Sequence, residues 1–142
     1  MNTIYSVNGP VVKVKNTKDF SMLEMVYVGN KRLIGEVIGI TEEFTTIQVY
    51  EVTTGLKVGE PVYNTNAPMS ATLGPGIISN IFDGIERPLK AIEKASGRFI
   101  DEGVNVPAID EEKFYDVTME VKAGDELRGG DIYASCPETA VI

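Results

Sequence analysis

The sequence contains no histidine and a single cysteine, Cys136, among its 142 residues. One cysteine cannot form an internal disulfide, and without histidine the chain cannot build the usual Cys/His zinc site on its own. The lack of imidazole also removes the commonest acid–base group near neutral pH, together with any Ser-His or Cys-His nucleophile. We therefore expect neither a zinc site of that kind nor histidine-dependent catalysis in this chain.

Long apolar runs are also missing. The hydrophobic fraction is 43% and the charged fraction 24%, as in an ordinary soluble globular protein. No window approaches the roughly 18 continuous apolar residues that a bilayer span needs. The first residues, MNTIYSVNGPVVKVK, lack a basic stretch followed by an apolar core, so a secretory signal is not expected and a cytoplasmic location is the default.

Positive charge is scarce, and the formal net charge is −8. This balance disfavours a nucleic-acid partner, because phosphate binding depends on clustered Lys and Arg. Residues 1–70 hold six basic and seven acidic side chains (net −1), whereas residues 71–142 hold seven and fourteen (net −7). The acidity therefore belongs to the second half of the chain.

The first half has the pattern of short strands. Residues 11–15 (VVKVK) alternate apolar and basic side chains, and residues 45–51 (TTIQVYE) alternate again. Residues 25–40 contain two β-rich runs that a turn at 29–31 divides, and 53–64 place glycines before a last strand. We expect about five or six strands closed into a small barrel, because closure removes exposed edges.

A connector follows the barrel, with the predicted domain boundaries at residues 1–68, 69–98 and 99–142. Within it, residues 77–82 and 86–96 are helix-compatible and are separated by Asp83-Gly84. Pro88 suits a first helical turn, and Gly97 suits the left-handed position after a helix end. The second piece places Leu89, Ile92 and Ala95 on one side, a stripe that usually packs into a core.

The last part returns to a β pattern. Residues 117–121 alternate, and 122–135 (KAGDELRGGDIYAS) predict a turn, a short strand, a second turn and another strand. A sheet of about three short strands would leave an apolar edge unpaired. We therefore expect a partial β-rich sandwich that stops before it is complete, so that the overall class is mainly β.

Glycine-rich stretches suggest a search for phosphate chemistry. The spacing G-x-x-x-x-G-K-[ST] is absent, since neither 55–59 nor 124–129 is followed by Lys-Ser or Lys-Thr. These glycines are expected to serve tight turns. The acidic run Asp110-Glu111-Glu112 has no EF-hand spacing and no convergent partner, so a solvated loop is expected.

A swinging-arm carrier is a second possibility. The spacing K-x-G-D-x-x-x-x-G-D in residues 122–131 resembles the hammerhead halves of lipoyl and biotinyl carrier domains. Such domains modify a lysine at a hairpin tip, beside Met or Asp, and neither Lys113 nor Lys122 has that context. Only the sandwich-like fold is expected to be shared. Cys136, next to Pro137, is expected to fill apolar space rather than act as a nucleophile.

Read together, the segments resemble one family over essentially the whole chain, the catalytic A subunits (alpha chains) of V/A-type rotary ATPases, in their N-terminal quarter. The segments with the resemblance are residues 6–12 (SVNGPVV), 35–38 (GEVI), 46–51 (TIQVYE), 54–56 (TGL), 59–62 (GEPV) and above all 73–89 (LGPGIISNIFDGIERPL). Residues 103–104 and 121–132 resemble the insertion that separates this catalytic chain from its noncatalytic partner.

The resemblance implies a different role for each part of the chain. Residues 1–68 would form the barrel that alternates with the barrels of noncatalytic B subunits in a hexameric crown. Residues 73–92 would lead toward a nucleotide-binding domain, and residues from 99 would begin the bulge domain, which would contact the peripheral stalk. The parent subunit would use ATP and magnesium and couple ATP synthesis or hydrolysis to proton or sodium transport, on the cytoplasmic face of the membrane.

The resemblance also limits what this chain can do. The family's P-loop, catalytic carboxylate and in-trans arginine would all lie beyond Ile142. We therefore expect no catalytic residue, no cofactor-binding residue and no metal ligand in this chain, and no enzyme activity of the chain alone. The second half of the bulge would also be missing, and the chain is expected to be a fragment. The alternative is a freestanding interaction protein with only the barrel and half of the bulge, completed by strand exchange or self-association with another copy.

Overall fold

The computed structural model describes residues 2–15, 18–78, 80–97 and 101–139. The chain divides into two compact units, one of Met1–Ala71 with Ile92–Asn105 and the other of Thr72–Ala91 with Val106–Ile142. Within the described ranges, no helix reaches the length and apolarity that a bilayer crossing requires. The boundaries predicted at residues 68 and 98 stay a prediction.

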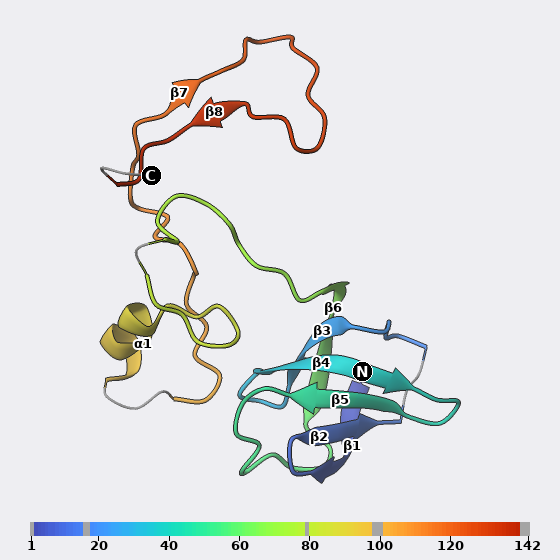
Figure 1. Cartoon of the computed structure of the whole chain (residues 1–142). Helices are drawn as coiled ribbons and strands as arrows, with labels where there is room; N and C mark the ends of the chain where they lie inside the picture. Colours follow the sequence, from blue (N-terminus) through green and yellow to red (C-terminus); the bar gives the residue numbers. More distant parts are fainter. Residues whose placement is uncertain (1, 16–17, 79, 98–100, 140–142) are drawn as a thin grey trace. The chain divides into compact units, whose positions relative to one another are not determined.

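The first unit is built around a closed six-stranded barrel (Figure 1). Its strands are β1 (Asn2–Asn8), β2 (Val11–Val14), β3 (Glu24–Val28), β4 (Leu33–Ile40), β5 (Thr45–Val49) and β6 (Pro61–Pro68). All pairings are antiparallel in the order β1-β2-β5-β4-β3-β6, and β1 closes the barrel against β6. The prediction of a mainly β chain with a small closed barrel is confirmed.

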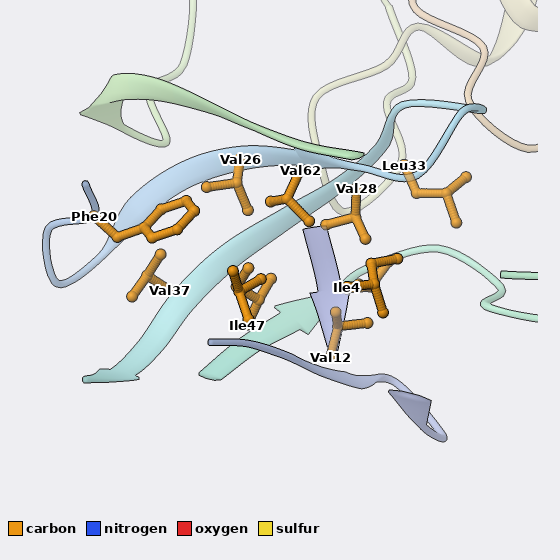
Figure 2. Close-up of a cluster of buried hydrophobic side chains, with 11 residues drawn as sticks. Ile4, Val12, Phe20, Val26, Val28, Leu33, Val37, Ile47 and Val62 are labelled. Carbon is orange, nitrogen blue, oxygen red and sulfur yellow. The ribbon is translucent and has the colours of Figure 1, made fainter. Parts of the chain in front are cut away.

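Side-chain alternation explains why these residues form a barrel. In β2, Val12 and Val14 are buried while Lys13 is exposed, so this strand gives one face to the core and the other to solvent. Figure 2 shows the apolar side chains converging inside the barrel. The buried cluster consists of Ile4, Val12, Val14, Phe20, Val26, Val28, Leu33, Val37, Ile47, Val49 and Val62.

One charged side chain lies buried at the start of β3. Glu24 is 2% exposed. Its Oε1 accepts a hydrogen bond from the backbone N–H of Asn66 at 2.7 Å, and its Oε2 accepts one from the N–H of Ser21 at 2.8 Å. Asn66 lies in β6 with φ +58°, an uncommon backbone conformation. The Glu24 carboxylate therefore joins the chain before β3 to the irregular end of β6.

The single helix of the described residues is α1 (Leu89–Ser96). It confirms the helix predicted over 86–96, with Pro88 just before its first residue. Gly97 ends it with φ +80°, and its N–H donates to the Glu93 carbonyl at 2.9 Å. Ile92 is buried, but Ala95 is exposed, so the predicted apolar stripe is narrower than expected.

The helix predicted over 77–82 was wrong for the part of it that the structure describes. Here the chain turns, because the N–H of Ile77 donates to the Gly74 carbonyl and the N–H of Asn80 to the Ile77 carbonyl. It then becomes extended, and Phe82 pairs with Pro88 in an antiparallel bridge. Local apolar pattern suggested a helix, but turn and bridge hydrogen bonds take the backbone groups that a helix would use.

An Asp83–Arg87 pair braces this extended loop. Asp83 Oδ1 accepts hydrogen bonds from the N–H groups of Ile85 (3.1 Å) and Arg87 (2.9 Å), and Oδ2 accepts one from Arg87 Nε at 2.8 Å. Burial by itself raises the pKa of Asp83, but the hydrogen bonds and charge of Arg87, with the Ile85 N–H, outweigh burial and lower the pKa below its ordinary value. The loop is therefore held by a carboxylate that stays ionised.

We expect Asp83→Asn to loosen this loop by about 1–2 kcal/mol at neutral pH, since it removes charge-assisted hydrogen bonds at a partly exposed site. Because the folded-state pKa is lowered, the stabilisation is complete above the unfolded-state pKa of about 3.9 and disappears as the pH falls through the folded-state value. Hydrogen exchange of the Ile85 and Arg87 amides measures the difference, with the exposed Asp116→Asn as the control. Equal protection in both variants at pH 7 would contradict this role.

The second unit also contains a short hairpin. Its strands are β7 (Thr118–Met119) and β8 (Ala134–Ser135), antiparallel to each other (Figure 1). The strand predicted between the two turns was wrong, since residues 126–128 are neither helix nor strand and Leu127 is 50% exposed. With no neighbouring strand to pair with among the described residues, this stretch has no partner for its ladder hydrogen bonds.

Candidate interaction surface

A cation–aromatic patch lies on the outer wall of the barrel and consists of Tyr5, Lys13, Lys15 and Phe44. The rings of Tyr5 and Phe44 lie 5.0 Å apart at a 41° tilt. Lys13 Nζ lies 5.6 Å from the centre of the Phe44 ring, and Lys15 Nζ lies 5.4 Å from the centre of the Tyr5 ring. Four side chains, from β1, from β2 and the residue after it, and from the residue before β5, therefore form one connected surface.

The local structure explains how these side chains meet. Lys13 and Lys15 alternate with buried valines and so point outward. The register of β1 against β2 shifts between Ile4 and Ser6, a bulge that re-aims the side chains at that point. Tyr5 remains 49% exposed. Of the described residues, no acidic side chain pairs with Lys13 or Lys15, so the patch presents positive charge beside apolar rings.

Another polar contact crosses the outer wall between β4 and the residue after β5. Tyr50 Oη donates a hydrogen bond to Glu36 Oε2 at 2.8 Å. This bond, with a smaller effect of burial and the charge of Glu36, raises the pKa of Tyr50 above its ordinary value. The phenol therefore remains protonated, and its hydrogen bond joins the two strands on the solvent side.

The glycine-rich loops do not fit a nucleotide. Around residues 55–59, Glu60 accepts hydrogen bonds from the N–H groups of Lys57 (3.2 Å) and Asn30 (3.0 Å). In the later loop, the Lys122 N–H donates to Asp125 Oδ2 and the Arg128 N–H donates to Asp131 Oδ2. A phosphate cradle needs such N–H groups free and a positive environment, but here carboxylates occupy them. These loops are turns, and we assign no nucleotide step to them.

The remaining residues considered from the sequence do not converge. Asp110 Oδ1 accepts a hydrogen bond from the Glu112 N–H at 3.0 Å within an exposed turn. Lys113 Nζ lies 4.7 Å from the Tyr115 ring, and a hydrogen bond with Tyr115 raises the pKa of this lysine. Cys136 is half-buried and free. The prediction that the chain holds no catalytic or cofactor-binding residue stays a prediction.

The acidic side chains and Cys136 do not form a metal-binding cluster among the described residues. Over the residues that the structure describes, no three or more Cys, Asp or Glu side chains gather closely enough to hold an ion. The carboxylates at Glu24, Glu60 and Asp83 each accept backbone hydrogen bonds instead.

The cation–aromatic patch was not predicted from the sequence. The alternation of Lys13 and Lys15 was visible, but the approach of Tyr5 and Phe44 depends on the bulge and the barrel register.

The barrel defines the class of protein. Residues 4–66 match the family model described as the ATP synthase alpha/beta family, beta-barrel domain. The match covers β2 to β5 in full and most of β1 and β6. The architecture and the sequence pattern therefore agree.

Relatives across the whole chain narrow this class. The chain is 54% identical over 142 residues to the V-type ATP synthase alpha chain 2 of Clostridium tetani, and all of this chain is covered. It is 49% identical over 139 residues to the V-type ATP synthase alpha chain of Halothermothrix orenii, covering 98% of this chain. It is 48% identical over 142 residues to the catalytic A subunit of the V-type proton ATPase of Cyanidium caldarium, also covering 98%.

These matches show the family. The chain belongs to the family of V- and A-type ATP synthase alpha chains, which are also named catalytic A subunits. It spans 24% of the length of each of these three curated relatives.

A solved structure shares the fold. The ATPase EscN of the type III secretion system of enteropathogenic E. coli aligns with a TM-score of 0.56 at 20% identity, over 62% of this chain and 21% of EscN. At that identity the likeness concerns the fold alone. It supports the barrel architecture that the sequence predicted.

Proposed function

We propose that this chain is the N-terminal assembly region of the catalytic A subunit of a V/A-type ATP synthase or ion-pumping ATPase. The proposal rests on sequence identity of 48–54%, over 98–100% of this chain, to proteins named as V-type ATP synthase alpha chains or catalytic A subunits. In this role the barrel packs beside the barrels of B subunits in a hexameric ring. The parent subunit uses ATP with magnesium, and the whole complex couples ATP synthesis or hydrolysis to proton or sodium transport at the cytoplasmic face of a membrane.

The cation–aromatic patch is the part of the barrel that we assign to the contact with the barrel of a neighbouring B subunit. Aromatic side chains are enriched at protein interfaces, and Tyr5 offers a large rigid surface at small entropic cost. Lysines beside such rings match a neighbour that presents carboxylates, and opposite potentials favour one orientation over others. A ring of alternating subunits needs two different faces on each barrel, and this patch supplies one.

Assembly of the complete A subunit with B subunits tests this function. We expect Lys13→Glu to weaken assembly of the ring by about tenfold or more, since a like charge would then face the neighbour's carboxylates. Lys57→Glu is the matched control, because Lys57 is also exposed and has the same charge change away from the patch. Native mass spectrometry over a concentration series gives the fraction assembled.

Two outcomes distinguish the proposed role of the patch from the proposed role of the whole barrel. If Lys13→Glu assembles as well as Lys57→Glu, the patch is not the contact face. If an A subunit that lacks residues 1–68 forms a ring with its B partners as stably as the complete protein does, the barrel has no assembly role and the proposed function is wrong. Thermal unfolding of each variant confirms that the rest of the protein is folded.

The second unit supplies the proposed contact with the peripheral stalk. Its acidic run at residues 110–112 is exposed, and the unit as a whole holds eleven acidic and five basic side chains (net −6), which suits a basic helix of a stalk protein. Charge reversal at Asp110, Glu111 and Glu112 should weaken stalk association in a salt-dependent manner. Unchanged association would remove support for this contact while leaving the proposed role of the barrel intact.

A further inference from the structure

Residues 101–105, here called the strap, lie against the outer wall of the barrel. They belong to the same compact unit as the strands, although they follow the end of β6 by more than thirty positions in the sequence. The N–H of Gly103 donates a hydrogen bond to Glu51 Oε2 at 2.8 Å, and Glu51 Oε1 accepts another from the N–H of Ile34 at 3.0 Å. One carboxylate therefore joins the strap to β4.

The loop between β3 and β4 makes a second contact with the strap. Lys31 Nζ forms an ion pair with Glu102, and the hydrogen bond and charge of Glu102 raise the pKa of this lysine. Gly103 has φ +72°, and a Cβ there would overlap the Lys31 carbonyl oxygen. Only glycine fits this close approach without strain, so the path of the strap is fixed at one residue.

The strap covers apolar surface that the barrel core does not use. Ile34 is only 8% exposed, yet it is not part of the core cluster. It lines a cavity of about 190 Å³ with Tyr27 and Glu51 from the barrel side and Gly103 and Val104 from the strap. Arg32 borders the same cavity, with its guanidinium 5.0 Å from the centre of the Tyr63 ring. Ile34 is therefore buried on the outside of the barrel, beneath the strap.

The contacts described for the strap are polar, whereas the barrel is held by a buried apolar core. The Lys31–Glu102 pair is exposed, and ion pairs of this kind contribute little net stability. The strap adds no residue to the buried apolar cluster, and its Gly103 and Val104 are only half-buried. A segment with few buried apolar contacts opens locally, at a lower free energy than the unfolding of the whole domain.

We propose that residues 101–105 act as a releasable strap that Glu51 holds closed over the Tyr27–Ile34 wall of the barrel. Opening breaks the Glu51–Gly103 hydrogen bond and the Lys31–Glu102 pair while the six strands stay paired. It exposes an apolar and aromatic surface next to Arg32, on the barrel wall. This inference concerns contacts within this chain and holds independently of the proposed function.

Amide hydrogen exchange of the whole 142-residue chain tests the strap. In the unchanged chain the Gly103 amide should exchange at least about tenfold faster than the β2–β5 ladder amides around the Val12–Ile47 pair, relative to unstructured rates. Glu51→Ala should speed exchange at Gly103 by a further factor of about ten and leave those ladder amides within about twofold. Glu43→Ala, an exposed glutamate in the β4–β5 turn, is the matched control and should change neither.

A second variant makes the test independent of Glu51. Gly103→Ala should give the same local acceleration of exchange at residues 101–105, because its Cβ meets the Lys31 carbonyl. The proposal is overturned if Gly103 exchanges only with global unfolding, or if Glu51→Ala leaves its exchange unchanged. It is also overturned if Glu51→Ala and Gly103→Ala both speed the ladder amides as much as Gly103, since the strap would then be an inseparable part of the barrel.

Discussion

Replacing Ile47 by alanine should lower the free energy of unfolding of the barrel by about 2–5 kcal/mol. Ile47 is 0% exposed at the centre of the core, where it pairs with Val12 on β2 and with Val37 on β4. Truncation removes buried apolar atoms and leaves a cavity that a closed barrel cannot easily collapse, because every strand has a neighbour on both sides. Urea denaturation followed by circular dichroism measures the loss as a lower midpoint.

The neighbouring strand offers the control for this prediction. Ile38 in β4 is 41% exposed, and Ile38→Ala removes the same atoms from the outer wall. A change within about 0.5 kcal/mol is expected there. If the two alanine variants unfold at the same urea concentration, the assignment of Ile47 to a well-packed core is wrong.

Glu24→Ala should destabilise the barrel by about 2–4 kcal/mol. The change removes the acceptor of two backbone N–H groups, those of Ser21 and Asn66, at a position that is 2% exposed. Buried donors left without a partner cost roughly 1–3 kcal/mol each, and Asn66 also loses the bond that holds its left-handed backbone. Equilibrium denaturation measures the loss in free energy of unfolding, and hydrogen exchange of the Asn66 amide shows whether the end of β6 is the part that loosens.

Two further variants define the chemistry at Glu24. Glu24→Gln keeps one amide oxygen as an acceptor and should lose less stability than alanine. Glu42→Ala, in the exposed β4–β5 turn, should be close to neutral. An alanine effect at Glu24 no larger than that at Glu42 would show that water replaces the carboxylate, contrary to its burial in the structure.

Much of the barrel could be predicted from sequence because β2, β3 and β5 alternate buried and more exposed side chains. Val12, Lys13, Val14 and Lys15 already define which face of β2 is buried, and the turn at 29–31 separates β3 from β4. Strand order was not available from this pattern, since β2 pairs with β5 and β3 with β6 across long stretches of sequence. Pairing of that kind depends on tertiary packing rather than on local propensity.

The errors fall where local signals and tertiary contacts disagree. Apolar residues at 77–82 suggested a helix, but the bridge between Phe82 and Pro88 and the Asp83 loop take the backbone hydrogen bonds. The cation–aromatic patch and the strap depend on residues far apart in sequence, such as Tyr5 with Phe44 and Glu51 with Gly103. No periodicity within a short window could have joined them.

Closure of the barrel by β1 against β6 also sets the order in which the domain can fold. Asn2 pairs with Val62 and Thr3 with Pro61. The closed ring of interstrand hydrogen bonds is therefore complete only when β6 pairs with β1. Contacts between such distant positions require a large loop to close first, which slows folding relative to a chain of local hairpins. During synthesis the first strand therefore remains without its closing partner until β6 has been made, and its unpaired edge is exposed for that interval.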